Sequence, residues 1–550
     1  MRKDARQILN HSSVHCDVCV VGSGAAGITT ARELALAGVS VLLIEAGGEK
    51  QRPEQVDLYR GKSKSTNHGP LHLYRQRRLG GTTVVWGGRS APYETIDLEN
   101  RSYVPQSGWP ISENDLNSAY IKAHEYLDLG AFSYSAEESF PASAQFPVSC
   151  GPAVVVDKIF RFSLPTNFWS KYQSVFSSHK NADVIVNGSC TEVVTNPKGD
   201  RVACLRVMSS SDHQFTVRAK TYVLAMGGLE VTRLLLASAS VHKSGIGNSH
   251  DLLGRFYISH LTGNAGTIHF NRGYGEYFRK YVVSEGVYCK RLMRLTHDAQ
   301  RRNGLLNLAV TATHMEFHDP SHRSGVLSSV YLAKRYLLGR IPPEFSRELS
   351  DSEYHHLLKH ATNVIFSPLE MLSFAYTWTR RRLLASRKLP SVEICNDQGI
   401  YTLHFDAEQS PNFDSRVTLN DERDELGTPR LVVDWRMNRG DAESVSRSLE
   451  LISRDLESAG VAKLNVKPDL ANDVYAHNGV GSHHIGTTRM GRSPSTAVVD
   501  SECRVFGIPN LYIASSSVFP TSSYVNPTFQ IVAIAIRIAA HIARSSRCLK

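Results

Sequence analysis

A glycine motif near the N-terminus constrains the fold of this chain more than any other feature. Residues 22–27 read Gly-Ser-Gly-Ala-Ala-Gly and fit the pattern G-x-G-x-x-G. The apolar run at residues 18–21 predicts a short buried strand before the motif. The following residues predict a helix over 25–36 and a second strand over 39–44. This strand–helix–strand order predicts a parallel sheet with a right-handed crossover.

Each position of the motif suits a dinucleotide. Gly22 permits the tight turn, Gly24 lets the backbone approach a pyrophosphate, and Gly27 lets the helix pack closely on the strand. The first helical residues, Ala25 and Ala26, offer free N–H groups to the phosphates at the helix N-terminus. The alternative interpretation is a tight glycine turn that binds no ligand.

Glu45 ends the second predicted strand and can accept hydrogen bonds from ribose hydroxyls. A carboxylate at this point disfavours NADP, because the 2′-phosphate would be repelled. The motif alone leaves NAD and FAD open. The motif lies near the N-terminus, and Glu45 and Ala46 begin the sequence Glu-Ala-Gly-Gly. Both features resemble the dinucleotide motif of flavoproteins.

A second glycine-rich stretch at residues 78–88 favours FAD. Its small residues let backbone amides approach a ring or a phosphate closely, although a glycine turn packed on the core is the alternative. The expected cofactor contacts in this stretch are Gly80, Gly81, Thr82, Thr83, Trp86, Gly87 and Gly88.

The length, net charge and cysteine content limit the classes of protein to which this chain can belong. The length of 550 residues exceeds one ordinary domain of about 100–200 residues. The net charge of +10 is modest for this length, and no nucleic-acid motif accompanies it. The nine cysteines are scattered and odd in number, so we expect neither a disulfide framework nor a metal site. We expect no secretory signal, no membrane-spanning helix and a cytoplasmic location.

Four blocks of the sequence, in order, resemble the glucose–methanol–choline (GMC) oxidoreductase family. They are residues 22–45, 80–88, 482–491 and 510–528. The resemblance implies an α/β protein with a discontinuous Rossmann-like FAD-binding domain. It also implies a substrate-binding domain with a mixed or antiparallel sheet over the flavin. We expect the FAD domain at 12–90, 181–265 and 480–546, and the substrate domain at 91–180 and 266–479.

The spacing of the last two blocks resembles the pyranose oxidase and bacterial sugar-dehydrogenase branch. Members of that branch place a His–Asn pair before the flavin, and the matching positions are His483 and Asn526. Some relatives bind FAD covalently through a histidine where this chain has Val85, so we expect non-covalent FAD. The further cofactor contacts that the resemblance implies are Val193, Ala225, Gly227, Ser515, Asn526, Pro527 and Thr528.

The His–Asn pair suits the oxidation of an alcohol. An imidazole can accept the hydroxyl proton, and a carboxamide can donate a hydrogen bond to the substrate oxygen. His484 is the rival base, and in an extended chain only one of the two neighbours would face the flavin. We expect His484 to pack structurally, and His260 to be structural or at most to line the flavin pocket. Ala514 replaces an aspartate of many relatives, which weakens a side-chain contact there.

A basic helical insertion is expected near residues 330–390. Its aromatic residues and arginines suit either an anionic membrane surface or a solvated helix that packs its apolar side on the protein.

We expect oxidation of a CH–OH group of a sugar or glycoside, with oxygen or another electron acceptor. The alternatives are oxidation of a non-sugar alcohol in natural-product biosynthesis, a membrane-associated dehydrogenase that reduces a quinone, an NAD-linked dehydrogenase, a flavin enzyme acting on other substrates, or a non-catalytic binding protein.

Overall fold

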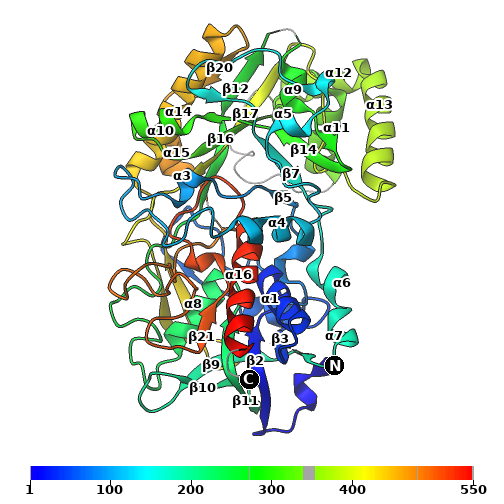
Figure 1. Cartoon of the computed structure of the whole chain (residues 1–550). Coiled ribbons are helices and arrows are strands. Elements are labelled where there is room, and N and C mark those ends of the chain that lie inside the picture. Colours follow the sequence, from blue (N-terminus) through cyan, green and yellow to red (C-terminus); the bar gives the residue numbers. More distant parts are fainter. Residues whose placement is uncertain (1, 272, 338–352, 480, 548–550) are drawn as a thin grey trace.

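The computed structural model describes residues 2–271, 273–337, 353–479 and 481–547. Within these ranges the chain forms two layered units, which Figure 1 shows one below the other. A large sheet with helices on it forms the lower unit, and a second sheet covered by helices forms the upper one.

The lower unit contains an eight-stranded sheet in the order β1-β8-β3-β2-β11-β10-β9, with β21 paired to β11. The pairs from β1 to β11 and the β11–β21 pair are parallel, whereas β10 and β9 are antiparallel. The strands are β1 (Arg2–Asp4), β2 (Ser13–Val21), β3 (Val41–Ile44), β8 (Ala182–Val186), β9 (Ser189–Thr195), β10 (Val202–Ser210), β11 (His213–Leu224) and β21 (Leu511–Ile513).

The two ends of the chain share this lower unit. Helix α1 (Ala25–Leu36) packs against α16 (Thr528–Arg547), which also contacts α4 (Asn117–Tyr126). In Figure 1 the blue α1 and the red α16 lie side by side over the sheet. Helix α8 (Gly228–Ala237) follows β11 and packs on β9. Segments from both ends of the sequence therefore build one core.

The upper unit contains a six-stranded antiparallel sheet in the order β20-β12-β17-β16-β15-β6. Helix α14 (Arg439–Ser458) packs on β20, β15 and β6. The strands are β6 (Val154–Val155), β12 (His260–Phe270), β15 (Met293–Leu295), β16 (Leu308–Thr313), β17 (Ile400–Glu408) and β20 (Ala462–Val466).

Two smaller sheets join the units. One has the order β13-β14-β7-β5 and the other the order β18-β19-β4. Their strands are β4 (Gly61–Ser63), β5 (Arg89–Ser90), β7 (Ile159–Phe162), β13 (Val282–Ser284), β14 (Val287–Arg291), β18 (Arg416–Arg423) and β19 (Pro429–Asp434). Strand β5 carries Arg89, which becomes important in the site described below.

The α/β fold class is confirmed, and the first elements match their predictions closely. Helix α1 has the predicted bounds, while β3 begins at Val41 and β2 begins earlier, at Ser13. Residues 51–80 contain strand β4 and helix α2 (Pro53–Asp57), which proline can begin because its missing N–H is not needed there.

The glycines of the motif have the conformations and contacts that the pattern predicts. Gly22 has a φ of +98°, and a Cβ there would lie 2.7 Å from the Ala225 oxygen. A Cβ on Gly27 would lie 1.7 Å from the Gly22 oxygen. Gly22 is therefore needed for the turn, and Gly27 for the close approach of α1 to the strand.

The basic insertion lies partly outside the described residues, which omit 338–352. Its described part contains α11 (Gly325–Leu332), α12 (Glu353–Phe366) and α13 (Pro368–Trp378). Across the described ranges no helix combines the length and the hydropathy needed to cross a bilayer.

Candidate active site and cofactor cavity

A cavity of about 400 Å³ lies where the ends of β2, β3 and β11 meet the C-terminal segment. That position is the usual ligand site of a parallel α/β sheet, beyond the carboxyl ends of the strands. Most of the predicted cofactor residues line this cavity: Gly22, Gly24, Ala25, Ala26, Glu45, Ala46, Gly81, Thr82, Thr83, Trp86, Gly87, Ala225, Gly227, Ser515, Asn526, Pro527 and Thr528.

Four predicted contacts do not line the cavity: Gly27, Gly80, Gly88 and Val193. Gly27 serves the packing of α1, and Gly80 is the left-handed residue before the turn at residues 81–84. Val193 is buried, and its N–H donates to Ser238 Oγ at 2.9 Å. The start of the same strand, from Ser189 to Thr191, lines the cavity in its place.

The glycine-lined part of the cavity fits the phosphates of a dinucleotide. A Cβ on Gly24 would have no described protein atom within 4 Å, because that position faces open space. A Cβ on Gly81 would lie 3.0 Å from the Gly24 Cα, so the two glycine turns approach each other closely. Backbone N–H groups and the N-terminus of α1 are available there for an anionic ligand.

Glu45 is held in place by the turn that it faces. Its carboxylate accepts from the Ser23 N–H at 2.9 Å, from Ser23 Oγ at 2.7 Å and from the Gly47 N–H at 2.9 Å. Burial raises the pKa of Glu45, and the bonds from Ser23 and Gly47 oppose that rise. The carboxylate is therefore positioned at the cavity wall, where its predicted bonds to a ribose remain to be tested.

The backbone places His483 opposite His260. Ile258 and Ile485 form an antiparallel bridge, with N–H to oxygen distances of 3.1 Å in both directions. His260 and His483 each lie two residues from this bridge, so they face each other across the two paired segments. Their Nδ1 atoms lie 3.1 Å apart. The sequence predictions did not include this contact.

The partners of His260 determine which nitrogen of His483 can act as a base. The Ser522 carbonyl oxygen only accepts, and it lies 2.9 Å from His260 Nε2, so His260 donates there. A neutral His260 then accepts at Nδ1, and His483 must donate to it through its own Nδ1–H. This leaves a lone pair on His483 Nε2. That atom has no hydrogen-bond partner within the described part of the chain, and His483 lines the cavity.

Burial keeps both imidazoles neutral. It lowers the pKa of His483 well below its usual range, and the charges of His260 and Arg89 lower it further. Burial lowers the pKa of His260 to about 4, although Asp406 opposes this. At neutral pH the pair is therefore uncharged, which is the state that the proton chain requires.

Arg89 fixes the orientation of the Asn526 amide. Its Nη2 and Nε atoms donate to Asn526 Oδ1 at 2.8 and 3.2 Å. A guanidinium only donates, so the amide oxygen faces Arg89 and the amide nitrogen faces away from it. Asp406 holds Arg89 from the other side, with bonds of 2.7 and 2.9 Å. Burial alone would raise the pKa of Asp406, but the charge of Arg89, its hydrogen bonds and the nearby histidines together lower the pKa to about 2.

His484 lines the cavity together with His483, so the expectation that only one of them faces the flavin stays a prediction. The chain bends at Ser482 and is not a regular strand there, so neighbouring side chains need not point to opposite sides. His484 stacks on Tyr257, with ring centroids 6.1 Å apart, and burial lowers its pKa to about 3. This packing agrees with a structural part for His484.

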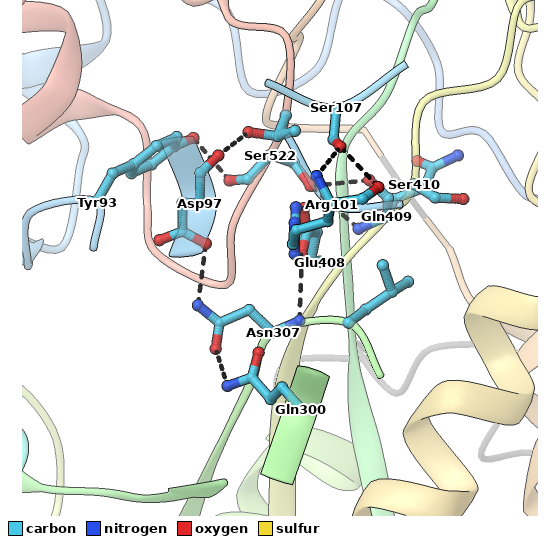
Figure 2. A network of polar contacts seen from close by, with 12 residues as sticks. Tyr93, Asp97, Arg101, Ser107, Gln300, Asn307, Glu408, Gln409, Ser410 and Ser522 are labelled. Atoms are coloured by element: carbon cyan, nitrogen blue, oxygen red, sulfur yellow. Dashed lines mark hydrogen bonds and ion pairs between the residues drawn. The ribbon is translucent and has the colours of Figure 1, made fainter. Parts of the chain in front are cut away.

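A buried polar network holds the loop that contains Ser522 (Figure 2). Arg101 forms two bonds with Glu408, at 2.8 and 2.5 Å, and both side chains are almost completely buried. Ser522 Oγ accepts from the Gln409 N–H at 3.0 Å, and the Ser522 carbonyl accepts from Tyr93 at 2.6 Å. Through Ser522 this network reaches His260.

Comparison with known proteins agrees with this arrangement. A family model described as "FAD binding domain" matches residues 15–130, and one described as "GMC oxidoreductase" matches residues 411–535. The chain is 24% identical to paromamine 6'-oxidase of Streptomyces fradiae, over 96% of this chain and 91% of that protein.

The chain therefore contains a FAD-binding domain and a GMC oxidoreductase domain. The fructose dehydrogenase large subunit of Gluconobacter japonicus is 22% identical over 96% of this chain and 98% of its own length. The solved structure of pyridoxine 4-oxidase from Mesorbium loti has the same fold, with a TM-score of 0.51 and 18% identity over 96% of this chain and 99% of that one.

With these two domains and these relatives, the protein uses FAD to oxidise CH–OH groups, which confirms the predicted cofactor and reaction class. Val85 lines the cavity and carries no atom that could form a covalent bond to the cofactor. Non-covalent binding therefore remains our expectation. The predicted division into domains also remains a prediction, although β12 starts at His260, within the segment 181–265 that we assigned to the FAD domain.

Proposed function

We propose that this protein oxidises a hydroxyl group of a sugar or glycoside, with His483 as the base and Asn526 as its partner. The main observation is that His483 and Asn526 line the same cavity as the glycine motif. His260 holds His483 so that Nε2 is free, and Arg89 holds Asn526 so that the amide nitrogen is free. When bound, FAD supplies the acceptor for the hydride that leaves the substrate carbon.

The protein's own groups perform the proton chemistry. His483 Nε2 takes the hydroxyl proton while the Nδ1–H bond to His260 holds the imidazole in the required tautomer. Asn526 Nδ2 donates to the same substrate oxygen, and so stabilises the negative charge that develops on it. General-base catalysis of this kind contributes about 10²–10⁴ in rate.

A row of polar groups beside the cavity supports a polyhydroxylated substrate. The row continues from Asp406, which holds Arg89, along the faces of β12 and β17. Thr262 Oγ1 lies 3.3 Å from both Asp406 and His404, and His404 Nδ1 lies 3.0 Å from Asn264 Oδ1. Thr262 is exposed, and His404 and Asn264 are half-buried. Adjacent donors and acceptors of this kind suit several neighbouring hydroxyls.

The relatives favour the same substrate class. Paromamine 6'-oxidase and fructose dehydrogenase act on sugars by name, and both align with nearly the whole chain. Sugars and glycosides therefore rank ahead of simple alcohols as candidate substrates.

An anaerobic screen tests the proposal. The FAD-loaded protein is mixed with free sugars, glycosides, polyols, simple alcohols and amines, and the loss of flavin absorbance is followed. We expect sugars or glycosides to reduce the flavin. We expect His483→Ala to retain FAD and to be reduced at least about 10²-fold more slowly. His250→Ala, which changes an exposed histidine, is the matched control. Reduction by simple alcohols alone would contradict the substrate class, and a fully active His483→Ala would contradict the base.

A further inference from the structure

Helices α12 and α13 present an exposed row of large apolar side chains. Phe366 at the end of α12 is 79% exposed, Leu369 at the start of α13 is 80% exposed, and Leu384 just after α13 is 79% exposed. We name this row and its neighbours the α12–α13 surface; its members are Ile365, Phe366, Leu369, Leu372, Tyr376, Leu383 and Leu384. Contiguous apolar exposure of this kind marks a binding surface in most proteins.

The row lies on one side of the helix because of its spacing. Leu369, Leu372 and Tyr376 follow one another at three and four residues within α13, which places them on the same helical face. The opposite face is packed on the protein. Met371 and Phe374 contact the small core cluster that contains Val326, Leu327 and Ile394.

A half-buried carboxylate fixes this orientation. Glu370 accepts from Ser324 Oγ at 2.5 Å and from the Gly325 N–H at 2.7 Å, at the start of α11. The bonds hold α13 with its inner side against α11, and so they direct the apolar row outward. The insertion therefore packs one apolar side on the same protein, as one of the alternatives expects, and leaves a second apolar row exposed.

The charges beside the row are positive. Residues 371–392 contain no aspartate or glutamate. Arg380 and Lys388 are exposed, and Arg382 is half-buried beside them. Arg380 donates to Tyr376 Oη at 3.0 Å, so an aromatic ring and a guanidinium lie together at the edge of the row. Each such cation is attracted to an anionic bilayer.

We propose that the α12–α13 surface binds the surface of a bilayer that contains anionic lipids. Apolar side chains next to arginine, tyrosine and tryptophan are typical of helices that lie in the membrane interface. With 14 and 11 residues, α12 and α13 are shorter than the roughly 20 residues that span a bilayer. A second copy of the chain is a poorer occupant, because a symmetric contact through this surface would bring Arg380 and Arg382 of both copies together.

Vesicle co-sedimentation of the full-length, FAD-loaded protein tests the proposal without turnover. The vesicles are phosphatidylcholine alone and phosphatidylcholine with phosphatidylglycerol. We expect the protein to pellet with the anionic vesicles and to remain in the supernatant with the neutral ones. Raised salt should weaken binding, because it screens the attraction.

Three variants separate the contributions. A triple variant, Leu369→Ser with Leu372→Ser and Leu384→Ser, should lower partitioning at least 10-fold. The variant Arg380→Gln with Arg382→Gln should also lower it and should remove most of the salt dependence. Leu9→Ser is the matched control, because Leu9 is 78% exposed and precedes β2 of the large sheet, away from the α12–α13 surface in the sequence. Retained flavin absorbance shows that each variant is folded.

Several outcomes would overturn the proposal. They are wild-type protein that stays in the supernatant with both vesicles, equal pelleting with neutral and anionic vesicles, or equal pelleting by the triple variant. A dimer in solution that the triple variant converts to a monomer would instead assign this surface to a second copy of the chain.

Discussion

One proton lies between the Nδ1 atoms of His483 and His260, which are 3.1 Å apart, and the bond from His260 to Ser522 determines that His483 carries it. This makes His260 a positioning residue: it touches no substrate in the proposed reaction, but it keeps the lone pair of His483 on Nε2. The order Ser522, His260, His483 leads from the buried network of Figure 2 to the cavity.

Replacing His260 should slow flavin reduction without changing substrate binding. In His260→Leu the tautomer of His483 is no longer fixed, so we expect the rate constant to fall about 10-fold or more while KM changes little. His260→Gln offers an oxygen to His483 and an N–H to Ser522, and it should restore much of the rate. Anaerobic stopped-flow measurements check this. Equal rates for the leucine and glutamine variants would contradict the proton chain.

The rate of flavin reduction should not fall as the pH decreases through 6.5. An ordinary histidine base would become protonated there, but burial lowers the pKa of His483 well below that value. A lowered pKa keeps the base neutral at every pH above it, so the loss of activity should begin only at lower pH. The charged and titratable groups near His483 are His260, Arg89, His484 and Asp406. A kcat/KM profile with an inflection near 6.5 would contradict this.

Changing Asn526 to aspartate should impair catalysis more than folding. A carboxylate can still accept from Arg89, but it cannot donate to the substrate oxygen. Loss of such a donor typically lowers kcat by about 10²–10³. The measurement compares flavin reduction and thermal unfolding of Asn526→Asp with those of the wild type. A variant that unfolds early and keeps its kcat would indicate a structural part for Asn526.

Gly24 and Gly22 should respond differently to substitution. A Cβ on Gly24 would meet no described protein atom within 4 Å, whereas one on Gly22 would lie 2.7 Å from the Ala225 oxygen. Gly24→Val should therefore fold as the apoprotein but bind FAD poorly, and Gly22→Val should be destabilised even without FAD. Flavin content and apoprotein melting temperature measure these effects. An unstable Gly24→Val apoprotein would refute the difference.

The buried pair of Arg101 and Glu408 should be important for stability. Glu408→Gln leaves the Arg101 charge buried without its counterion, which costs about 3–5 kcal/mol. Glu99→Gln is the control, because Glu99 pairs with Arg301 at the surface, where such a pair contributes about 0–1 kcal/mol. Denaturant unfolding measures both. Similar losses in the two variants would show that burial does not govern the effect.

Local patterns predicted the cofactor end of the site well. The turn from Gly22 to Gly27 and the helix after it follow from the spacing of glycines and apolar residues, and α1 has the predicted bounds. Residues 81–83 also line the cavity as expected, because small residues in a loop indicate that its backbone can approach a ligand closely. Val193 illustrates the limit: the resemblance implied a cofactor contact there, but Val193 lies inside β9 and the cavity meets the start of that strand instead.

The contacts that hold His483 and Asn526 in place could not be predicted from such patterns. Arg89 and Asp406 are 317 residues apart, and His260 and His483 are 223 apart. Their contacts depend on how the small sheet of β5 and the antiparallel sheet of β12 and β17 meet. No local periodicity encodes that meeting. A strand-like run ending at His260 was the available signal, and it did not identify the partner.

The shared core of α1 and α16 has a consequence for biosynthesis. Residues 21–26 line the cavity with residues 514–516 and 526–528, so the cavity is complete only when the last part of the chain has left the ribosome. A nascent chain that carries the glycine motif alone offers FAD one wall of its site. Stable loading of the cofactor must therefore follow translation of the C-terminal segment, and a protein truncated before residue 511 should accumulate, if at all, without its yellow colour.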